Sequence, residues 1–171
     1  MADFLAECVA VLTRTPATLD AMLRGLPQVW TTADEGPETW SPYFVLGHLI
    51  HGERTDWMTR MEIILRDGTG RPFDPFVREP EMEPGRTVES LLDEFAGLRR
   101  ENLERLRALA LGSEQLALEG THPAFGVVTA RQLLATWTAH DLAHILQVSR
   151  VMAKRLKSEV APWAAYLSVM K

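Results

Sequence analysis

The chain has 171 residues, of which 46% are hydrophobic and 24% charged, and this composition is typical of a globular protein and excludes a disordered or fibrous one. At this mass, folding hides about 70% of the surface of the extended chain. One core therefore suffices for a single domain over residues 1–171, and a metal site would serve function rather than folding. The formal net charge of -5 argues against binding to nucleic acid or to an anionic membrane.

The first predicted helix runs from Asp3, as N-cap, to Arg24, which precedes a glycine and a proline. Pro16 lies near its middle. Proline lacks a backbone N–H and clashes with the preceding turn. The helix is therefore either kinked near Thr15 or begins afresh there.

Cys8, the single cysteine, lies in an apolar run of this helix, so we expect a buried structural thiol. One cysteine excludes an intrachain disulfide and suits a reducing compartment. The N-terminal residues lack a basic region followed by a long apolar stretch, and no window approaches the roughly 18 uninterrupted apolar residues of a membrane span. We therefore expect a cytoplasmic protein without a signal peptide.

The second predicted helix begins at Ser41 as N-cap, with Pro42 at the first helical position, and ends near Arg66. Residues 67–86 follow as a loop of about twenty residues, a length that compact domains use mainly for function. Apolar side chains stand between the prolines of this loop, and we expect them to pack onto the helices. They are Phe73, Phe76 and Met82.

The third predicted helix starts after Thr87 and ends near Leu111. Its apolar residues recur at spacings of three and four and give an amphipathic stripe. Arginines also cluster in it, but glutamates interleave with them at helical spacing, so we interpret the cluster as a solvated, ion-paired face. The cluster consists of Arg99, Arg100, Arg105 and Arg107 with Glu101 and Glu104.

A loop over residues 120–126 precedes the fourth predicted helix, which begins after Thr129, has a capping box completed by Gln132, and reaches about Leu156. A short fifth helix is expected over residues 162–170. No period-two alternation persists anywhere, so no strand is expected. The predicted fold is all-α, a four-helix bundle with a short C-terminal helix, in which the long middle loop permits a parallel pair.

The most informative residues are His140 and His144. Histidines four apart on a helix lie on one face, and both imidazoles can reach one metal ion. A third ligand is needed, and the second helix offers His48 and His51. Periodicity does not choose between them, because the strongest apolar stripe of that helix faces elsewhere. This stripe consists of Leu46, Ile50, Trp57, Met61 and Ile64. The alternative is that the histidines are buried and only bond to carbonyl groups, without a metal.

Asp141 stands where the zinc-protease motif HExxH has its glutamate, and its shorter side chain reaches less far. It falls near the centre of the apolar stripe of the fourth helix, where a buried carboxylate needs a partner. Two hypotheses follow. Asp141 orients a ligating imidazole, or it forms an ordinary buried ion pair with an arginine.

The sequence resembles the DinB-like superfamily in the order and separation of several short segments. These are Trp40-Ser41, Leu46 to Leu49, His122 to Gly126 and Leu133 to His144, and the match continues through Gln147 and Pro162 to Leu167. The resemblance implies a four-helix bundle with up-down-down-up connectivity. It also implies a divalent metal held by His48, His140 and His144, which favours His48 over His51.

Characterised members of that superfamily include transferases of low-molecular-weight thiols and a mycothiol-dependent isomerase, so the resemblance implies a small-molecule substrate. No thiol-binding motif and no catalytic side chain can be named. His51 is expected either to contact substrate or to be an exposed surface residue. His122, Phe73 and Phe76 either border the pocket or only pack the loops.

Three neutral imidazoles leave a metal ion its full charge and an open position, where a water or thiol becomes a nucleophile near neutral pH. We therefore expect a thiol transferase-like or hydrolase-like activity. Zinc is favoured by the nitrogen ligands, and nickel, iron and manganese are alternatives. The other hypotheses are a noncatalytic metal-binding or stress-associated bundle that acts as a homodimer, and a protein that binds no metal.

Overall fold

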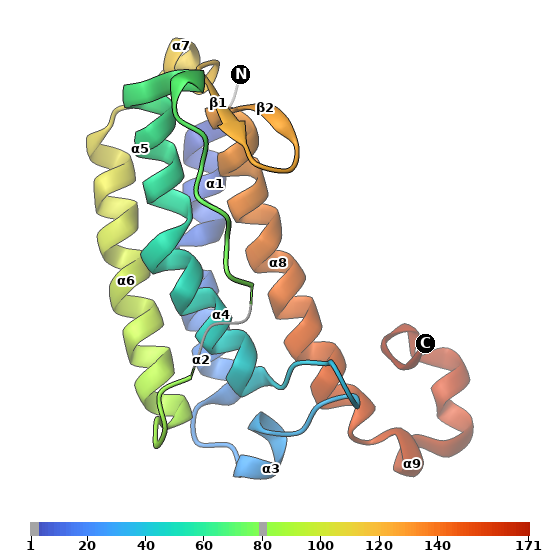
Figure 1. The fold of residues 1–171 in the computed structure, drawn as a ribbon. Helices are drawn as coiled ribbons and strands as arrows, with labels where there is room; N and C mark the ends of the chain where they lie inside the picture. The colour runs from blue at the N-terminus through green and yellow to red at the C-terminus, as the bar shows by residue number, and fades with distance from the viewer. Residues whose placement is uncertain (1–3, 79–81) are drawn as a thin grey trace.

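The computed structural model describes residues 4–78 and 82–171, which form a helical bundle (Figure 1). The long helices are α1 (Phe4–Leu12), α2 (Thr15–Leu23), α4 (Pro42–Thr55), α5 (Trp57–Asp67), α6 (Val88–Ala108) and α8 (Ala130–Lys154). Shorter helical segments are α3 (Gln28–Thr31), η1 (Gly68–Gly70), α7 (Ser113–Leu116), α9 (Lys157–Val160), η2 (Ala161–Tyr166) and η3 (Ser168–Met170). The strands β1 (Glu119–His122) and β2 (Gly126–Thr129) form an antiparallel hairpin just before α8.

The helices are arranged as four rods, formed by α1 with α2, α4 with α5, α6, and α8 (Figure 1). The second and third rods run parallel. Glu53 pairs with Arg99, and Glu62, further along the second rod, pairs with Arg105, further along α6. Residues 71–78 extend along the bundle beside α5 and α8 (Figure 1). The predominantly helical class predicted from the sequence is confirmed.

Buried apolar side chains form two clusters, and each rod passes from one to the other across its middle turns. One cluster includes Leu12, Trp57, Leu103 and Trp137, and the other includes Leu19, Ile50, Phe95 and Val148. The middle turns between the clusters carry buried polar side chains, namely Glu53, Arg99, Asn102 and Asp141. The bundle therefore has a polar layer between two apolar cores.

The first rod is broken where the sequence places Pro16. Helix α2 begins afresh at Thr15, and the predicted N-cap Asp3 lies outside the described residues. Proline at position 16 has no N–H to donate to the carbonyl of Leu12, four residues earlier. That carbonyl instead accepts a hydrogen bond from Nη1 of Arg99 at 2.9 Å. The helix break thus supplies the polar layer with a backbone acceptor.

The second rod is also broken, at Asp56, where the sequence predicts one helix over residues 41–66. Asp56 has φ -113° and ψ -77°, which ends α4, and α5 begins at the next residue. The indole of Trp57 folds back onto Gly52, where a Cβ would lie 3.2 Å from the indole nitrogen. At the start of the rod, Ser41 Oγ accepts from the Phe44 N–H, so the predicted N-cap is confirmed.

The expectation that the chain has no strand is wrong, and the expectation of one C-terminal helix is met only in part. The loop predicted over residues 120–126 is part of the β1–β2 hairpin, whose four-residue strands are too short to show an alternating pattern. At Gly120 a Cβ would lie 2.7 Å from Ile64 and 3.0 Å from Phe73, so the hairpin packs closely on α5 and the middle loop. The C-terminal segment, expected as one short helix over residues 162–170, is helical but is divided into two 3-10 helices, η2 and η3.

Other local signals agree with the structure. Thr129 and Gln132 form the predicted capping box at the start of α8, and Cys8 is a free, buried thiol. Among the residues that the structure describes, no helix combines the length and apolar character needed to cross a bilayer.

Candidate metal centre

Arg99 is the centre of the polar layer. Its side chain is 1% exposed, so the interpretation of the arginine cluster as a solvated face is wrong for this residue. Nε and Nη2 donate to Glu53 Oε1 at 3.1 and 2.8 Å, and Nη1 and Nη2 donate to the two carboxylate oxygens of Asp141 at 2.5 and 3.0 Å. With the bond to the Leu12 carbonyl, all five guanidinium N–H groups have acceptors.

The carboxylate of Glu53 accepts hydrogen bonds from two further side chains. Asn102 Nδ2 donates to Oε2 at 3.0 Å, and the indole N–H of Trp137 donates to Oε1 at 3.1 Å. Asp141 is fully buried, and both of its oxygens are engaged by Arg99. The buried ion pair is therefore the correct reading of Asp141, and the hypothesis that it orients a ligating imidazole is wrong.

Beside this network, three imidazoles from two rods converge. His48 projects from α4, and His140 and His144 project from α8. The Nε2 atom of His140 lies 3.0 Å from Nε2 of His48 and 3.1 Å from Nε2 of His144. In the described part of the chain these three residues form the cluster whose donor atoms all lie within 4.8 Å of one another.

The hydrogen bonds of the outer ring nitrogens fix where the lone pairs point. Nδ1 of His48 lies 2.9 Å from the backbone carbonyl of Arg78, and Nδ1 of His144 lies 2.8 Å from Oε1 of Gln147. Oxygen atoms of these kinds only accept, so both Nδ1 atoms carry the proton and both Nε2 atoms present lone pairs. His140 Nε2 can carry at most one hydrogen. It can therefore donate a hydrogen bond to Nε2 of His48 or to Nε2 of His144, but not to both.

A shared cation resolves this crowding of lone pairs. Nitrogen ligands lie about 2.0–2.1 Å from zinc in tetrahedral sites, which corresponds to roughly 3.3 Å between two of them. The separations of 3.0 and 3.1 Å are close to this value. The donor set and its spacing therefore fit a divalent metal ion.

The imidazoles are held in the neutral form that binds metals. Burial lowers the pKa of His48 to about 4 and that of His140 to about 3, and it also lowers the pKa of His144. Repulsion between the rings adds to the effect for His48 and His140, and the positive charge of Arg78 adds to it for His48 and His144. Burial therefore favours the neutral imidazole, which is the form that binds a metal ion.

The three histidines line a cavity of about 730 Å³. Its walls are mostly apolar and aromatic, and they come from α4, α5, α8, the middle loop and the hairpin. They include Trp40, Trp57, Phe73, Phe76, Phe125 and Leu133. Polar members of the wall include Asp56, Arg60, Arg78 and His122. The volume is in the range of small-molecule sites.

The family model of the DinB superfamily matches residues 11–148. The chain belongs to the DinB superfamily. A similar solved structure is that of "YfiT from Bacillus subtilis", described as "a probable metal-dependent hydrolase with an unusual four-helix bundle topology". The TM-score is 0.75 at 19% sequence identity, and the match covers 90% of this chain and 87% of that chain. The two proteins thus share a four-helix bundle fold. No match is found among the curated proteins.

In this DinB superfamily member, His51 stands apart from the cluster. It is half-buried, its ring packs against Phe76 with centroids 5.1 Å apart, and it lines a separate small hollow. His122, Phe73 and Phe76 lie in the wall of the histidine cavity. This agrees with the expectation that they border the pocket. Sequence reasoning missed Arg78, whose backbone orients His48, because a loop gives no periodic signal.

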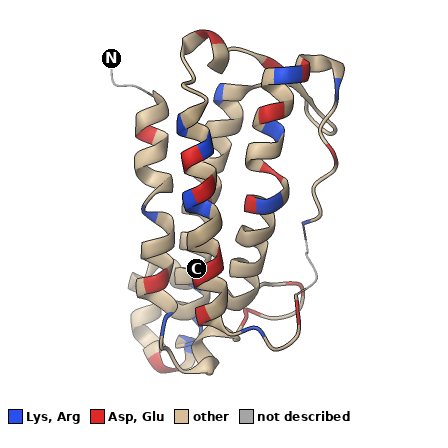
Figure 2. Cartoon of the chain, turned by 90° about the vertical axis from the view of Figure 1, so that its left-hand side faces the viewer, with Lys and Arg blue, Asp and Glu red and all other residues tan. Residues whose placement is uncertain are grey.

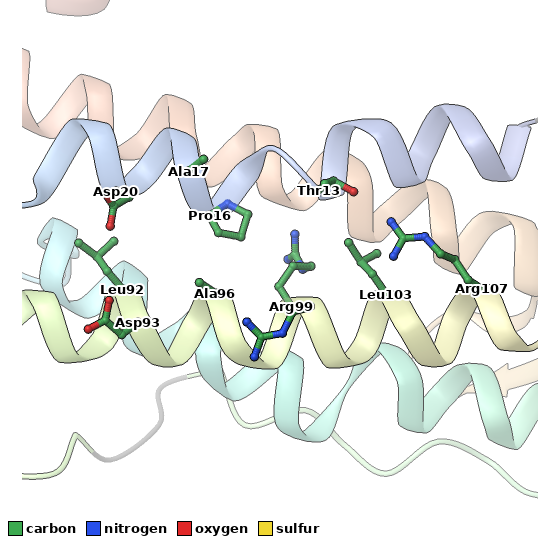
Figure 3. Close-up of a pocket in the computed structure, with 11 residues that line it drawn as sticks. Thr13, Pro16, Ala17, Asp20, Leu92, Asp93, Ala96, Arg99, Leu103 and Arg107 are labelled. Atoms are coloured by element: carbon green, nitrogen blue, oxygen red, sulfur yellow. The ribbon is translucent and has the colours of Figure 1, made fainter.

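A second hollow, of about 440 Å³, lies between the first rod and α6 (Figure 3). Figure 3 shows Pro16 facing Ala96 across it, and Arg99 is one of its lining residues. It contains no histidine, and Arg99 is already saturated there. In the view of Figure 2, basic and acidic residues interleave along the helices rather than gather by sign.

Proposed function

We propose that the protein is a metal-dependent enzyme in which His48, His140 and His144 hold a divalent ion at the wall of a small-molecule cavity. The observation that carries this proposal is the convergence of the Nε2 atoms, two of which have their lone pairs fixed by bonds at Nδ1. Nitrogen donors favour zinc, with nickel, iron or manganese as alternatives. When bound, such an ion supplies Lewis acidity, which makes a water or a thiol nucleophilic near neutral pH.

The residues of the chain itself prepare the site in three ways. Arg78 and Gln147 hold the outer nitrogens of His48 and His144, which fixes the tautomers before any ligand arrives. Trp57 packs against His140 with ring centroids 5.0 Å apart and keeps that ring in place. Phe73 and Phe76 from the middle loop add apolar surface to the cavity wall.

Thiol transfer to a small electrophile, or hydrolysis of a small molecule, is the reaction class that this arrangement favours. The partner that we propose is a low-molecular-weight thiol or a substrate of similar size. The superfamily match and the three-histidine cluster support metal dependence. The parallel course of the second and third rods supports the up-down-down-up connectivity.

A homodimer is included in the proposal because the outer face of α8 exposes apolar side chains. Leu142 is 53% exposed and Leu146 is 64% exposed, one helical turn apart. Exposed apolar residues at helical spacing favour contact with another helix. A noncatalytic metal-binding dimer would use the same surface, and the activity measurement below separates the two cases.

The metal proposal is tested by elemental analysis of the purified protein and by calorimetric titration with zinc, for the wild type and a His144→Ala variant. We expect one ion per chain in the wild type and none retained by the variant. Equal metal content in both proteins would contradict the proposed ligand set.

The enzymatic proposal is tested by following the consumption of a thiol-reactive electrophile and the hydrolysis of an activated ester, with zinc-loaded and chelated protein. We expect at least one rate to depend on the metal. Equal rates in both forms would leave only the noncatalytic hypothesis.

A further inference from the structure

Arg78 places a positive charge at the wall of the histidine cavity. Its guanidinium lies over the indole of Trp40, with 5.1 Å from Cζ to the ring centroid. The same indole packs against His48 at 4.7 Å and stacks on His144 at 6.2 Å. Through its backbone carbonyl, Arg78 also holds the His48 ring. The cation therefore stands one ring away from the histidine cluster.

Within the described residues, this charge has no carboxylate partner. The other arginine of the cavity, Arg60, is paired with Asp56, with 2.5 Å between Nε and Oδ1, so these two charges offset each other. Arg78 forms no ion pair and its side chain donates no hydrogen bond in the described part of the chain. Among the described residues of the cavity wall, Arg78 is thus a positive charge without a carboxylate partner, beside imidazoles whose donor set fits a second cation.

Two cations that face one cavity repel each other, and an anion bound between them offsets this repulsion. An arginine that is left unpaired beside a metal-binding set of ligands is complementary to a ligand with negative charge, and its planar fork matches a carboxylate. The remaining walls are aromatic and aliphatic, which suits an apolar body.

We propose that the cavity binds a small organic carboxylate with an apolar body, and that Arg78 is the residue that recognises its carboxylate. The substrate class within the proposed function is then an organic acid. The metal-dependent part of the inference rests on that proposed function, whereas recognition of the carboxylate by Arg78 does not require the metal.

The test compares phenylacetate with its neutral analogue phenylacetamide, which have nearly the same shape. Binding to the metal-free and the zinc-loaded protein is followed by calorimetry and by the fluorescence of the tryptophans in the cavity wall. The variants are Arg78→Gln and, as a matched control, Arg100→Gln. Arg100 is an exposed arginine that lines the hollow of Figure 3, away from the histidines.

In the metal-free wild type, we expect phenylacetate to bind at least about fivefold more tightly than phenylacetamide. Arg78→Gln should remove this preference and leave the affinity for the amide unchanged, whereas Arg100→Gln should leave both affinities unchanged. A purely structural role of Arg78 would weaken both ligands alike. Equal binding of acid and amide by the wild type, no saturable binding of either, or an effect of Arg78→Gln no larger than that of Arg100→Gln would overturn the proposal.

The affinity for zinc is a second measurement, in which Arg78→Gln should strengthen binding rather than weaken it. Without an organic anion, Arg78→Gln should bind zinc about two- to fivefold more tightly than the wild type, because a repelling charge has been removed. Weaker zinc binding by the variant would overturn the argument from repulsion. If no protein binds zinc, the proposed metal function fails, while the acid–amide comparison in the metal-free protein still decides the role of Arg78.

Discussion

Two groups of buried polar side chains lie next to each other in the middle of the bundle, and they are organised in opposite ways. In the group around Arg99, each guanidinium N–H has an acceptor and both carboxylates have several donors. In the group around His140, the inner nitrogens face one another with too few hydrogens, and the buried Nδ1 of His140 has no hydrogen-bond partner among the described residues. The first group is closed, whereas the second borders a cavity.

The difference separates a structural role from a functional one. A saturated network gains nothing from a ligand, and it fixes the spacing of the four rods, since its members come from α1, α4, α6 and α8. An unsaturated cluster that opens on a cavity gains the interactions that a ligand brings.

The largest effect is expected for Asp141→Ala, which removes one of the two carboxylates that neutralise Arg99. The buried guanidinium of Arg99 then loses two of its five hydrogen bonds, and the free energy of unfolding should fall by about 3 to 5 kcal/mol. Urea denaturation of the metal-free protein measures this. The control is Asp93→Ala, which breaks the exposed pair with Arg24 and should cost less than about 1 kcal/mol. Similar losses in both variants would show that the network is not closed as described.

The histidine cluster should respond in the opposite way. His48→Gln retains a side-chain N–H for the Arg78 carbonyl but removes the inner imidazole nitrogen. We expect zinc affinity to fall at least about 100-fold, which corresponds to roughly 2.7 kcal/mol, and the metal-free protein to lose less than about 1 kcal/mol of stability. Titration calorimetry and urea denaturation of the same preparation give both values. A large loss of stability with unchanged zinc affinity would make this histidine a structural residue.

Trp137→Phe tests whether the two groups are independent. Trp137 donates to Glu53 on one side and stacks on Trp57 at 5.8 Å on the other, and Trp57 in turn contacts His140. The variant should lose about 2 to 3 kcal/mol of stability through the hydrogen bond to a charged group and the smaller ring. Its zinc affinity should stay within about threefold of the wild type. A larger change would mean that the closed network positions the histidines.

Acidification should destabilise the metal-free protein through the histidine group. An unfolded histidine takes up a proton near its ordinary pKa of 6.5, whereas burial lowers the pKa of folded His48 to about 4 and that of His140 to about 3. Protons therefore favour the unfolded chain between these values. The stability of the metal-free protein, highest above pH 6.5, should fall with decreasing pH by up to ~1.4 kcal/mol per unit for each histidine.

Measuring the free energy of unfolding from pH 7 to pH 4.5 for the wild type and His140→Gln checks this expectation. Asp56 acts in the opposite direction, because burial raises its pKa to about 6, but it does so in both proteins. The difference between the two curves therefore isolates His140. Parallel curves would contradict the lowered pKa.

Local signals in the sequence predict much of this molecule. The spacing of His140 and His144 on one helix face is set by the geometry of a single helix, as are the caps at Ser41 and Thr129. Periodicity does not select His48, because a helical wheel over residues 41–66 crosses the break at Asp56. The apolar stripe that runs from Leu46 to Ile64 mixes the faces of two helices with different phases.

Local sequence patterns do not predict the burial of Arg99. Its neighbours in sequence are charged and solvated, and its acceptors come from three other helices. One of them is a carbonyl freed by a proline in the first rod. Such a network depends on contacts between residues far apart in the chain, which neither composition nor helical spacing encodes.

The proline and the arginine form a matched pair with an evolutionary consequence. If position 16 gained an ordinary N–H, the helix would reclaim the Leu12 carbonyl and one guanidinium hydrogen would be left without an acceptor. If position 99 changed first, the carbonyl would be stranded in the interior. Either change is harmful alone, so related chains are expected to keep both residues or to replace both together.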